Sequence, residues 1–403
     1  MKNTAGNSNT DSPKADSFEA LGIVPFLCNK LRERSIQKPT EVQSVVIPHF
    51  LVGENVLFRS PTGTGKTFAY LLPILQRLFT ENSPGMPQGK VRLLICAPTL
   101  ELCSQIKGEV DFLLGAWPAE TAPRAILLIG SANMERQITT LKKERPAIIV
   151  GNPARLLQLL RMGRLRLNEV KTAVLDEGDR LVSDEMREET EALFRFFSKP
   201  SAGSLQTASC SATVSDKSRE RLLPLLGSKT VFLETKGICR NIEHWAFFSE
   251  GRKKISCLRS LLAAAKPKKA LVFTTRAGEV GNILSQLQHH HFAAGAVCGD
   301  MDKQARKASM DGFRKGNLAI LVATDLACRG LDIPGISHVI ALDTPSDTEL
   351  YLHRSGRTGR TGKRGIMATI GNEEEMRRLE RIEKKLGIVV YPKELYGGRI
   401  LAP

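Results

Sequence analysis

The apolar residues of this chain occur in short unbroken runs, and most of these runs end at a glycine or at polar residues. A run that is apolar at every position predicts a strand buried on both faces, and helical stretches between such runs predict a parallel sheet covered by helices. In the first half of the chain, strands are expected at residues 56–58, 91–99, 126–129, 147–150, 173–175 and 205–209.

The pattern starts again in the second half, where strands are expected at residues 270–273, 296–298, 320–323 and 338–342. A chain of 403 residues is long enough for two domains that each bury a core. We therefore predict an α/β fold of two tandem domains, each a mostly parallel sheet with helices on both faces. Their expected bounds are 17–235 and 246–395, with a linker at 236–245, a disordered tail at 1–16 and a short tail at 396–403.

A glycine-rich turn, from Ser60 to Thr67, follows the first expected strand and precedes an apolar helix. Backbone N–H groups would converge at the start of that helix, where the helix dipole favours an anion. Gly63 and Gly65 allow the backbone to approach a phosphate, Lys66 supplies a positive charge, and the hydroxyl of Thr67 can bind Mg²⁺. The turn therefore predicts a nucleotide site, although Ser60 stands where such a loop usually has its first glycine.

Two neighbouring carboxylates follow the fifth expected strand, and two hydroxyls follow the sixth. Asp176 can hold Mg²⁺, commonly through water, and Glu177 can orient or deprotonate an attacking water. Ligands of parallel sheets bind beyond the carboxyl ends of the strands, so these side chains are expected to face the phosphate loop. Ser211 and Thr213 can either hydrogen-bond to the acidic cluster or cap a helix.

Gln43 lies shortly before the phosphate loop. Its amide both donates and accepts hydrogen bonds, so it can read the edge of adenine while the ring of Phe18 covers the base. The second half has no phosphate loop of its own, but residues 353–360 carry one histidine and three arginines. Guanidinium groups bind phosphate oxygens in pairs, and arginines of one domain can complete a site on another. A solvated or nucleic-acid-binding basic run is the alternative explanation.

The net charge of +16 points to a polyanionic partner, with a merely soluble basic surface as the alternative. No apolar run approaches the ~20 residues of a membrane-spanning helix, and the first sixteen residues lack the apolar centre of a secretory signal. The eight cysteines include no C-x-x-C pair, which favours buried thiols in a reducing compartment over disulfides or zinc ligands. We therefore expect a cytoplasmic protein that does not contact membranes.

Taken in order, these stretches resemble the DEAD-box RNA helicases of helicase superfamily 2 over residues 17–390. The matched pieces are Phe18, Gln43, the phosphate loop, Pro98–Thr99 with Glu101–Leu102, Gly130, Asn152–Pro153 with Arg155, Asp176–Asp179, Ser211–Thr213, Thr324–Asp332 and His353–Arg360. The resemblance implies two RecA-like domains. It also implies ATP and Mg²⁺ as cofactors, and ATP-dependent local unwinding of short RNA duplexes or remodelling of RNA–protein complexes.

The resemblance also implies a role for each matched residue. ATP would be bound by Phe18, Gln43, Thr62, Gly63, Thr64, Gly65, Lys66, Thr67 and Asp332. Catalysis would depend on Lys66, Asp176, Glu177, Arg357 and Arg360, the last two as arginine fingers, and Mg²⁺ on Thr67 and Asp176. Asp179, Ser211, Thr213 and His353 would couple hydrolysis to domain closure. RNA would lie along Thr99, Gly130, Asn152, Arg155, Arg306, Thr324 and Arg329.

Five positions depart from the family pattern. Leu100 stands for arginine, Ser131 for glycine, Asn152 for threonine and Lys303 for glutamine, all on the RNA side. Gly178 replaces the alanine of the acidic box, which predicts persistent ATPase activity with a somewhat looser backbone. We therefore expect RNA affinity or duplex preference to be the property that these departures affect.

The resemblance predicts a monomer that grips RNA through phosphates and 2′-hydroxyls with little sequence preference. Its RNA would be ribosomal or messenger RNA, and a protein cofactor would direct it. One alternative is a DNA-directed superfamily 2 helicase, and another is an RNA-binding clamp or assembly factor with weak ATPase activity. A P-loop kinase would not explain the second domain and its arginine segment.

Overall fold

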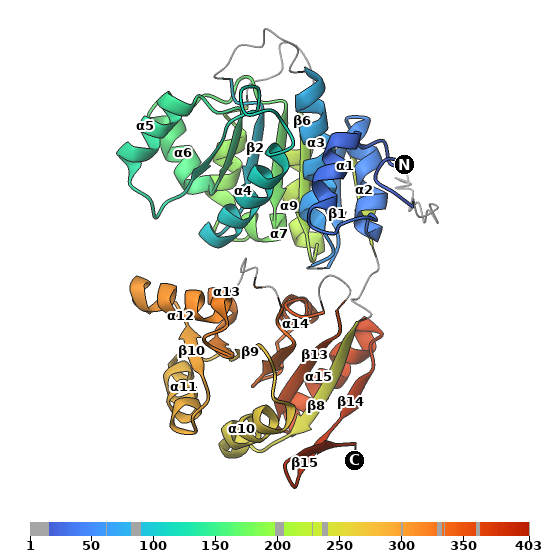
Figure 1. Ribbon diagram of the computed structural model, residues 1–403, viewed down its shortest axis with the longest axis vertical. Helices are drawn as coiled ribbons and strands as arrows, with labels where there is room; N and C mark the ends of the chain where they lie inside the picture. The colour runs from blue at the N-terminus through green and yellow to red at the C-terminus, as the bar shows by residue number, and fades with distance from the viewer. Residues whose placement is uncertain are drawn as a thin grey trace.

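The structure is a computed structural model that describes residues 16–61, 63–81, 90–197, 205–227, 229–235, 241–299, 301–328, 333, 335–359 and 363–402. Two α/β domains follow each other along the chain (Figure 1). Each contains a seven-stranded sheet whose strands are all parallel. The predicted fold class is therefore confirmed.

The sheet of the first domain has the strand order β3-β4-β2-β5-β6-β1-β7. Its strands are β1 (Asn55–Arg59), β2 (Leu93–Cys96), β3 (Ala125–Leu128), β4 (Ile148–Gly151), β5 (Thr172–Asp176), β6 (Gln206–Ser211) and β7 (Thr230–Glu234). Its helices are α1 (Pro25–Arg32), α2 (Glu41–Leu51), α3 (Lys66–Glu81), α4 (Leu100–Leu114), α5 (Met134–Glu144), α6 (Pro153–Arg161), α7 (Gly178–Leu181), α8 (Arg187–Phe194) and α9 (Asp216–Leu226).

Helices cover both faces of this sheet, so alternate strand residues enter two different cores. Val56 and Phe58 of β1 belong to one core, and Leu57 between them belongs to the other. All three side chains are fully buried. Burial on both faces explains why the strands are apolar at successive positions.

Polar residues after the strands start several of the helices. The side chain of Thr99 accepts a hydrogen bond from the backbone N–H of Leu102 at the start of α4 (3.2 Å). Asn133 caps α5 and Ser215 caps α9 in the same way. These caps satisfy backbone donors that would otherwise have no partner. They also fix helix N-termini at the carboxyl edge of the sheet, where the predicted ligands bind.

The second domain has the strand order β10-β11-β9-β12-β13-β8-β14. Its strands are β8 (Ile242–Phe248), β9 (Ala270–Phe273), β10 (Ala294–Val297), β11 (Ile320–Ala323), β12 (His338–Ala341), β13 (Gly365–Gly371) and β14 (Val390–Pro392). Its helices are η1 (Gly251–Lys253), α10 (Lys254–Ala265), η2 (Ala277–Glu279), α11 (Val280–His289), α12 (Lys303–Lys315), α13 (Asp325–Cys328), α14 (Thr348–Ser355) and α15 (Glu373–Leu386). A small antiparallel hairpin follows, made of β15 (Glu394–Tyr396) and β16 (Arg399–Leu401).

The second domain extends beyond its predicted bounds at both ends. β8 begins at Ile242, inside the predicted linker 236–245, because it pairs with β13 along its whole length. The hairpin β15–β16 occupies much of the predicted tail 396–403, and its Leu395 and Ile400 pack against the core. Residues 1–15 and 236–240 lie outside the described residues. They hold most of the predicted N-terminal tail and the first part of the predicted linker.

Among the described residues, no helix combines the length and the apolar character that crossing a membrane requires. Six cysteines can be assessed, and all six are free thiols. Burial raises the pKa of Cys103 to about 12, which keeps its thiol protonated and unreactive. The prediction of unpaired thiols is confirmed for these six.

Candidate ATP site and RNA track

The phosphate loop folds back on itself at the carboxyl end of β1. The side-chain ammonium of Lys66 donates to the carbonyls of Ser60 and Pro61, both at 2.8 Å. The hydroxyl of Thr64 donates to the Pro61 carbonyl at 2.8 Å and lies 2.7 Å from the hydroxyl of Ser60. Ser60, at the position where a glycine was expected, therefore helps to hold the turn. Thr62 lies outside the described residues.

Gln43 is built into the wall of this loop. Its side-chain oxygen accepts from the backbone N–H of Thr40 (2.9 Å), and its nitrogen donates to the carbonyl of Gly65 (3.1 Å). Gly65 has a φ of 93°, and a Cβ there would collide with the amide of Gln43, so only glycine fits. Phe18 is 2% exposed within the core of the first domain. Contact of either side chain with adenine stays a prediction.

Asp176 is 4% exposed at the end of β5, where two side chains fix its carboxylate. One oxygen accepts a hydrogen bond from the hydroxyl of Tyr70 (2.9 Å), and the other accepts from the thiol of Cys210 (3.2 Å). Sequence reasoning missed both partners. Tyr70 lies four residues after Lys66 on α3, so helical spacing would have placed it on the same face.

Glu177 connects β5 to α7 in a left-handed backbone conformation, with φ of 52° and ψ of 51°. A non-glycine residue in this region is uncommon, and such residues cluster at functional sites. Burial raises the pKa of its carboxyl, the charge of Arg357 opposes this, and the neighbouring Asp179 and Asp176 raise it further. Arg357 belongs to the second domain, so a charge of that domain acts on this carboxylate of the first.

Ser211 and Thr213 bind Asp179, which decides between the two roles that the sequence left open. The hydroxyl of Ser211 accepts from the backbone N–H of Asp179 (3.0 Å), and the hydroxyl of Thr213 donates to its carboxylate (2.9 Å). α9 is capped by Ser215 instead. Movement of the segment after β6 would therefore act directly on the acidic cluster.

Glu349 on α14 is a further carboxylate at this point, and sequence reasoning missed it. Burial raises its pKa, the charges of Asp179 and Asp347 add to this, and a hydrogen bond with Thr213 opposes it. Figure 1 shows α14 on the side of the second domain that faces the first. His353 lies one helical turn further along α14, and its bridge to the acidic cluster stays a prediction.

Residues predicted to line RNA come together at the ends of β3 and β4. The guanidinium of Arg155, which is 6% exposed, donates to the carbonyls of Gly130 (2.7 Å) and Ala132 (3.1 Å). The nearest atom to a Cβ placed at Gly130 would belong to the amide of Asn152, at 3.8 Å. Arg155 therefore shapes the turn after β3, and its direct contact with RNA stays a prediction.

Arg306 forms an ion pair between the two domains. Its guanidinium, on α12, lies 2.7 Å from the carboxylate of Glu101, which is on α4 of the first domain. Thr324 is 8% exposed at the end of β11, and Arg329 lies outside the described residues. The sequence indicated Arg306 but not its ion pair with Glu101.

Arg354 does not share the phosphate-binding role that the sequence suggested for the arginines of residues 353–360. Arg354 is 1% exposed and pairs inside the second domain with Asp325 (2.7 Å) and Asp343 (3.0 Å). A buried guanidinium with two carboxylate partners is structural, and it is not available to phosphate. The charge of Arg357 lowers the pKa of Glu177 against the effect of burial, whereas Arg360 and Asp332 lie outside the described residues.

Comparison with known proteins identifies the family. The sequence pattern of the DEAD/DEAH box helicases matches residues 40–222, and that of the helicase conserved C-terminal domain matches residues 253–362. The chain belongs to the DEAD-box family of ATP-dependent RNA helicases. It is an ATP-hydrolysing RNA helicase of two RecA-like domains.

Relatives match the helicase over nearly its whole length. The DEAD-box ATP-dependent RNA helicase CshC of Bacillus cereus is 36% identical over 374 residues, which cover 93% of this chain and 92% of CshC. The probable ATP-dependent RNA helicase YfmL of Bacillus subtilis is 34% identical over 377 residues, which cover 93% of this chain and 96% of YfmL. The structure of S. cerevisiae Dbp5 bound to RNA and ADP BeF3 is 25% identical, with a TM-score of 0.80 over 94% of this chain and 96% of Dbp5.

The donor set of the helicase suits a metal that arrives with the nucleotide. Asp176 and Thr67 supply hard oxygen ligands beside the phosphate loop. The described residues contain no group of three or more His, Cys, Asp or Glu side chains that could hold a metal ion by themselves. Mg²⁺ is usually bound by one or two carboxylates together with phosphates and water, so these residues fit it.

Proposed function

We propose that the helicase closes its two domains around ATP–Mg²⁺ and single-stranded RNA, and that Arg357 of the second domain completes the catalytic site around Glu177. The observation that carries this proposal is the charge interaction between these two residues. Arg357 is 6% exposed, so the charge acts where water screens it weakly.

In this proposal the phosphates of ATP occupy the loop around Lys66. Burial lowers the pKa of Lys66, and the surrounding acidic groups, including Asp176 and Glu177, oppose this. Lys66 would exchange its bonds with the loop carbonyls for phosphate oxygens. Thr67 and Asp176 would hold Mg²⁺, which when bound neutralises charge on the phosphates.

Glu177 would then accept a proton from the attacking water as ADP and inorganic phosphate form. A base must be ionised to do this, and burial works against ionisation of Glu177. The charge of Arg357 opposes that effect, so arrival of the second domain both activates the base and stabilises the charge that develops on the phosphoryl group. Arg360 would assist as a second arginine finger.

RNA would lie across both domains along the carboxyl edges of the sheets. We propose contact through phosphates and 2′-hydroxyls, with little sequence preference. Closure would bend one strand and so open a short duplex locally, or displace a bound protein, and hydrolysis would reopen the domains. The likeness to Dbp5 bound to RNA and ADP BeF3 supports this arrangement.

We further propose a cytoplasmic monomer that acts on ribosomal or messenger RNA and is directed by a protein cofactor. The free thiols support a reducing compartment. Two domains of one chain supply both Glu177 and Arg357, so the catalytic site needs no second copy.

A second candidate is an RNA clamp with weak turnover. Arg155 and Arg306 are both engaged by protein groups, and Leu100, 39% exposed, stands where the family usually has arginine. RNA would therefore stimulate hydrolysis weakly if these side chains had to make the essential contacts.

Steady-state ATP hydrolysis without nucleic acid, with single-stranded RNA and with matched DNA tests these possibilities. We expect stimulation by RNA alone and its loss in Glu177→Gln. Stimulation by DNA would indicate the DNA-directed helicase. RNA binding without stimulation would indicate the clamp.

A further inference from the structure

One hollow in the first domain is surrounded by positive charge. It has a volume of about 530 Å³ and lies where the C-terminal ends of α5 and α6 approach the amino ends of β2 and β4. Val91, Leu141 and Leu165 contribute apolar surface. Lys142, Arg145, Arg164 and Arg166 line the hollow, and among the described residues no carboxylate lines it. We call these four residues the basic cluster.

The basic cluster has no counter-charge. All four side chains are exposed, and within the described part of the chain none forms an ion pair or a side-chain hydrogen bond. The acidic residues nearby are already engaged: Glu144 pairs with Arg124, and Glu169 pairs with Lys90 and Arg92. Four cations around one concavity repel one another, so an anion bound there would be stabilised by all of them.

Helix dipoles account for only part of this arrangement. Lys142 lies in the last turn of α5, where a positive charge is favourable. Arg164 and Arg166 follow the end of α6 in a turn that contains Gly163, with a φ of 64°. They begin three residues after Arg161, the last residue of that helix, and they line the same hollow.

The position of the hollow separates it from the predicted RNA track. Gly130 and Asn152 lie at the carboxyl ends of β3 and β4, next to the first turns of α5 and α6. The basic cluster lies at the opposite ends of the same two helices. The 11 residues of α5 span about 16 Å at ~1.5 Å per residue. RNA that leaves the track beside these helices can therefore reach the hollow along the β3 end of the sheet, where Figure 1 places α5 and α6.

We propose that the basic cluster is an auxiliary binding site for the RNA backbone, which holds RNA flanking the segment gripped between the domains. The inference rests on the proposed function, and it identifies a surface that contributes part of the affinity of the helicase for RNA. Arg155 and Arg306 on the track are engaged by protein groups, whereas the described residues supply no ion-pair partner for the basic cluster. Phosphates at successive positions of one strand match that arrangement.

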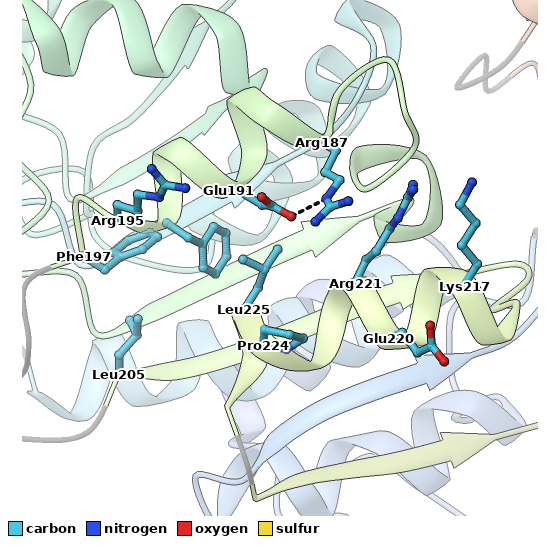
Figure 2. Close-up of a pocket in the computed structure, with 11 residues that line it drawn as sticks. Arg187, Glu191, Arg195, Phe197, Leu205, Lys217, Glu220, Arg221, Pro224 and Leu225 are labelled. Atoms are coloured by element: carbon cyan, nitrogen blue, oxygen red, sulfur yellow. Dashed lines mark hydrogen bonds and ion pairs between the residues drawn. The ribbon is translucent and has the colours of Figure 1, made fainter.

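A larger hollow on the same domain differs in charge pattern. The hollow between α8 and α9, shown in Figure 2, has a volume of about 910 Å³ and is lined by both cations and carboxylates. Glu191 pairs with Arg187, as Figure 2 shows. Lys217 and Arg221 both pair with Asp184, which is not among the lining residues. Its carboxylates would repel phosphates. It therefore supplies a matched control.

The test compares two triple variants, each of which loses the positive charges of one lysine and two arginines. Lys142→Gln/Arg164→Gln/Arg166→Gln removes most of the basic cluster, and Lys217→Gln/Arg187→Gln/Arg195→Gln changes the hollow of Figure 2. Binding is measured by fluorescence anisotropy over a salt series. The probes are an oligouridine of about 6 nucleotides, in the range of a single binding site, and one of about 30 nucleotides. Thermal unfolding of both variants checks that they are folded.

We expect the first variant to bind the long RNA about tenfold more weakly at low salt. The slope of log K against log salt should become less steep by about 2, at ~0.7 for each lost contact with single-stranded RNA. Binding of the short RNA and ATP hydrolysis stimulated by it should not change, and the control variant should retain wild-type binding of both RNAs.

Equal weakening by both variants, no weakening by the first, or equal weakening for short and long RNA would overturn the proposal. A wild-type protein whose hydrolysis does not respond to short RNA would instead contradict the proposed function. The binding comparison between the two variants could still be read in that case.

Discussion

The hydroxyl of Ser209 occupies the space that the side chain of an alanine at position 178 would need. A Cβ on Gly178 would lie well under 3.0 Å from this oxygen, closer than real Cβ contacts come. Ser209 lies on β6, fully buried, and its hydroxyl has no hydrogen-bond partner among the described atoms. The glycine in the acidic box thus has a steric reason, whereas the sequence suggested only a looser backbone.

We expect Gly178→Ala alone to lower the free energy of unfolding by about 1–3 kcal/mol, the usual range for overpacking a buried site. Ser209→Ala alone should change it by less, because it removes a hydroxyl that makes no hydrogen bond with the described residues. The double variant should recover most of the loss. Urea unfolding of the four proteins measures this coupling, and strictly additive effects would show that the two residues do not compete for space.

The ion pair between Glu101 and Arg306 predicts a contribution to domain closure. Both side chains are partly exposed, so the pair contributes about 1 kcal/mol or less. Arg306→Glu also brings two like charges together, and we expect the RNA concentration for half-maximal ATPase activity to rise about tenfold, equivalent to ~1.4 kcal/mol.

The charge-reversed pair Glu101→Arg/Arg306→Glu distinguishes the ion pair from direct RNA contact. Recovery to within a few-fold of wild type would indicate that Arg306 acts through Glu101. Persistence of the defect in the reversed pair would indicate that Arg306 contacts RNA itself, as its position in the family pattern implies.

The burial of His244 predicts that the stability of the second domain depends on pH. It is 5% exposed, its ring lies 2.8 Å from the hydroxyl of Tyr351, and burial lowers its pKa from 6.5 to about 4. Between these values the unfolded chain binds the extra proton, so stability falls as pH drops from 6.5 to 4. The loss at the acidic end is about 3 kcal/mol at ~1.4 kcal/mol per pKa unit.

Urea unfolding of wild type and His244→Gln from pH 7.5 to 4 isolates this contribution. The variant should be less stable than wild type at pH 7.5, and the difference should shrink toward pH 4. His289→Gln, at an exposed histidine of α11, should follow the wild-type profile. A constant difference between wild type and His244→Gln would argue against titration of this ring.

The sequence predicted the fold where burial acts on every residue of a strand. β9 and β11 are four-residue runs buried at every position, and their apolar composition follows directly. β8 and β13 were not predicted. β8 is buried only at His244 and Phe247, and β13 carries glycine at both ends and Thr369 inside. Neither strand is apolar along its whole length.

Strand order also predicted part of the candidate site. Residues placed by strand order, such as Asp179 and Thr213, came together because parallel strands end at one edge. The different roles of Arg354 and Arg357 could not be predicted, since residue type and spacing do not show which of two arginines meets buried carboxylates and which faces the other domain. Glu349 required the placement of α14 against the first domain.

The interaction of Arg357 with Glu177 predicts a shift in the pH dependence of hydrolysis. Arg357 opposes the effect of burial on the pKa of Glu177, so Arg357→Ala should let that pKa rise. The acidic limb of the pH–rate profile should then move to higher pH, because a larger share of the base is protonated at a given pH. On the plateau, the rate should fall about 10³-fold through loss of the arginine's charge.

Single-turnover hydrolysis from pH 5 to 9 measures both effects, and Arg364→Ala, at an exposed arginine before β13, serves as the control. A reduced plateau with an unmoved acidic limb would mean that Arg357 acts on the phosphates alone and that another group sets the ionisation of Glu177.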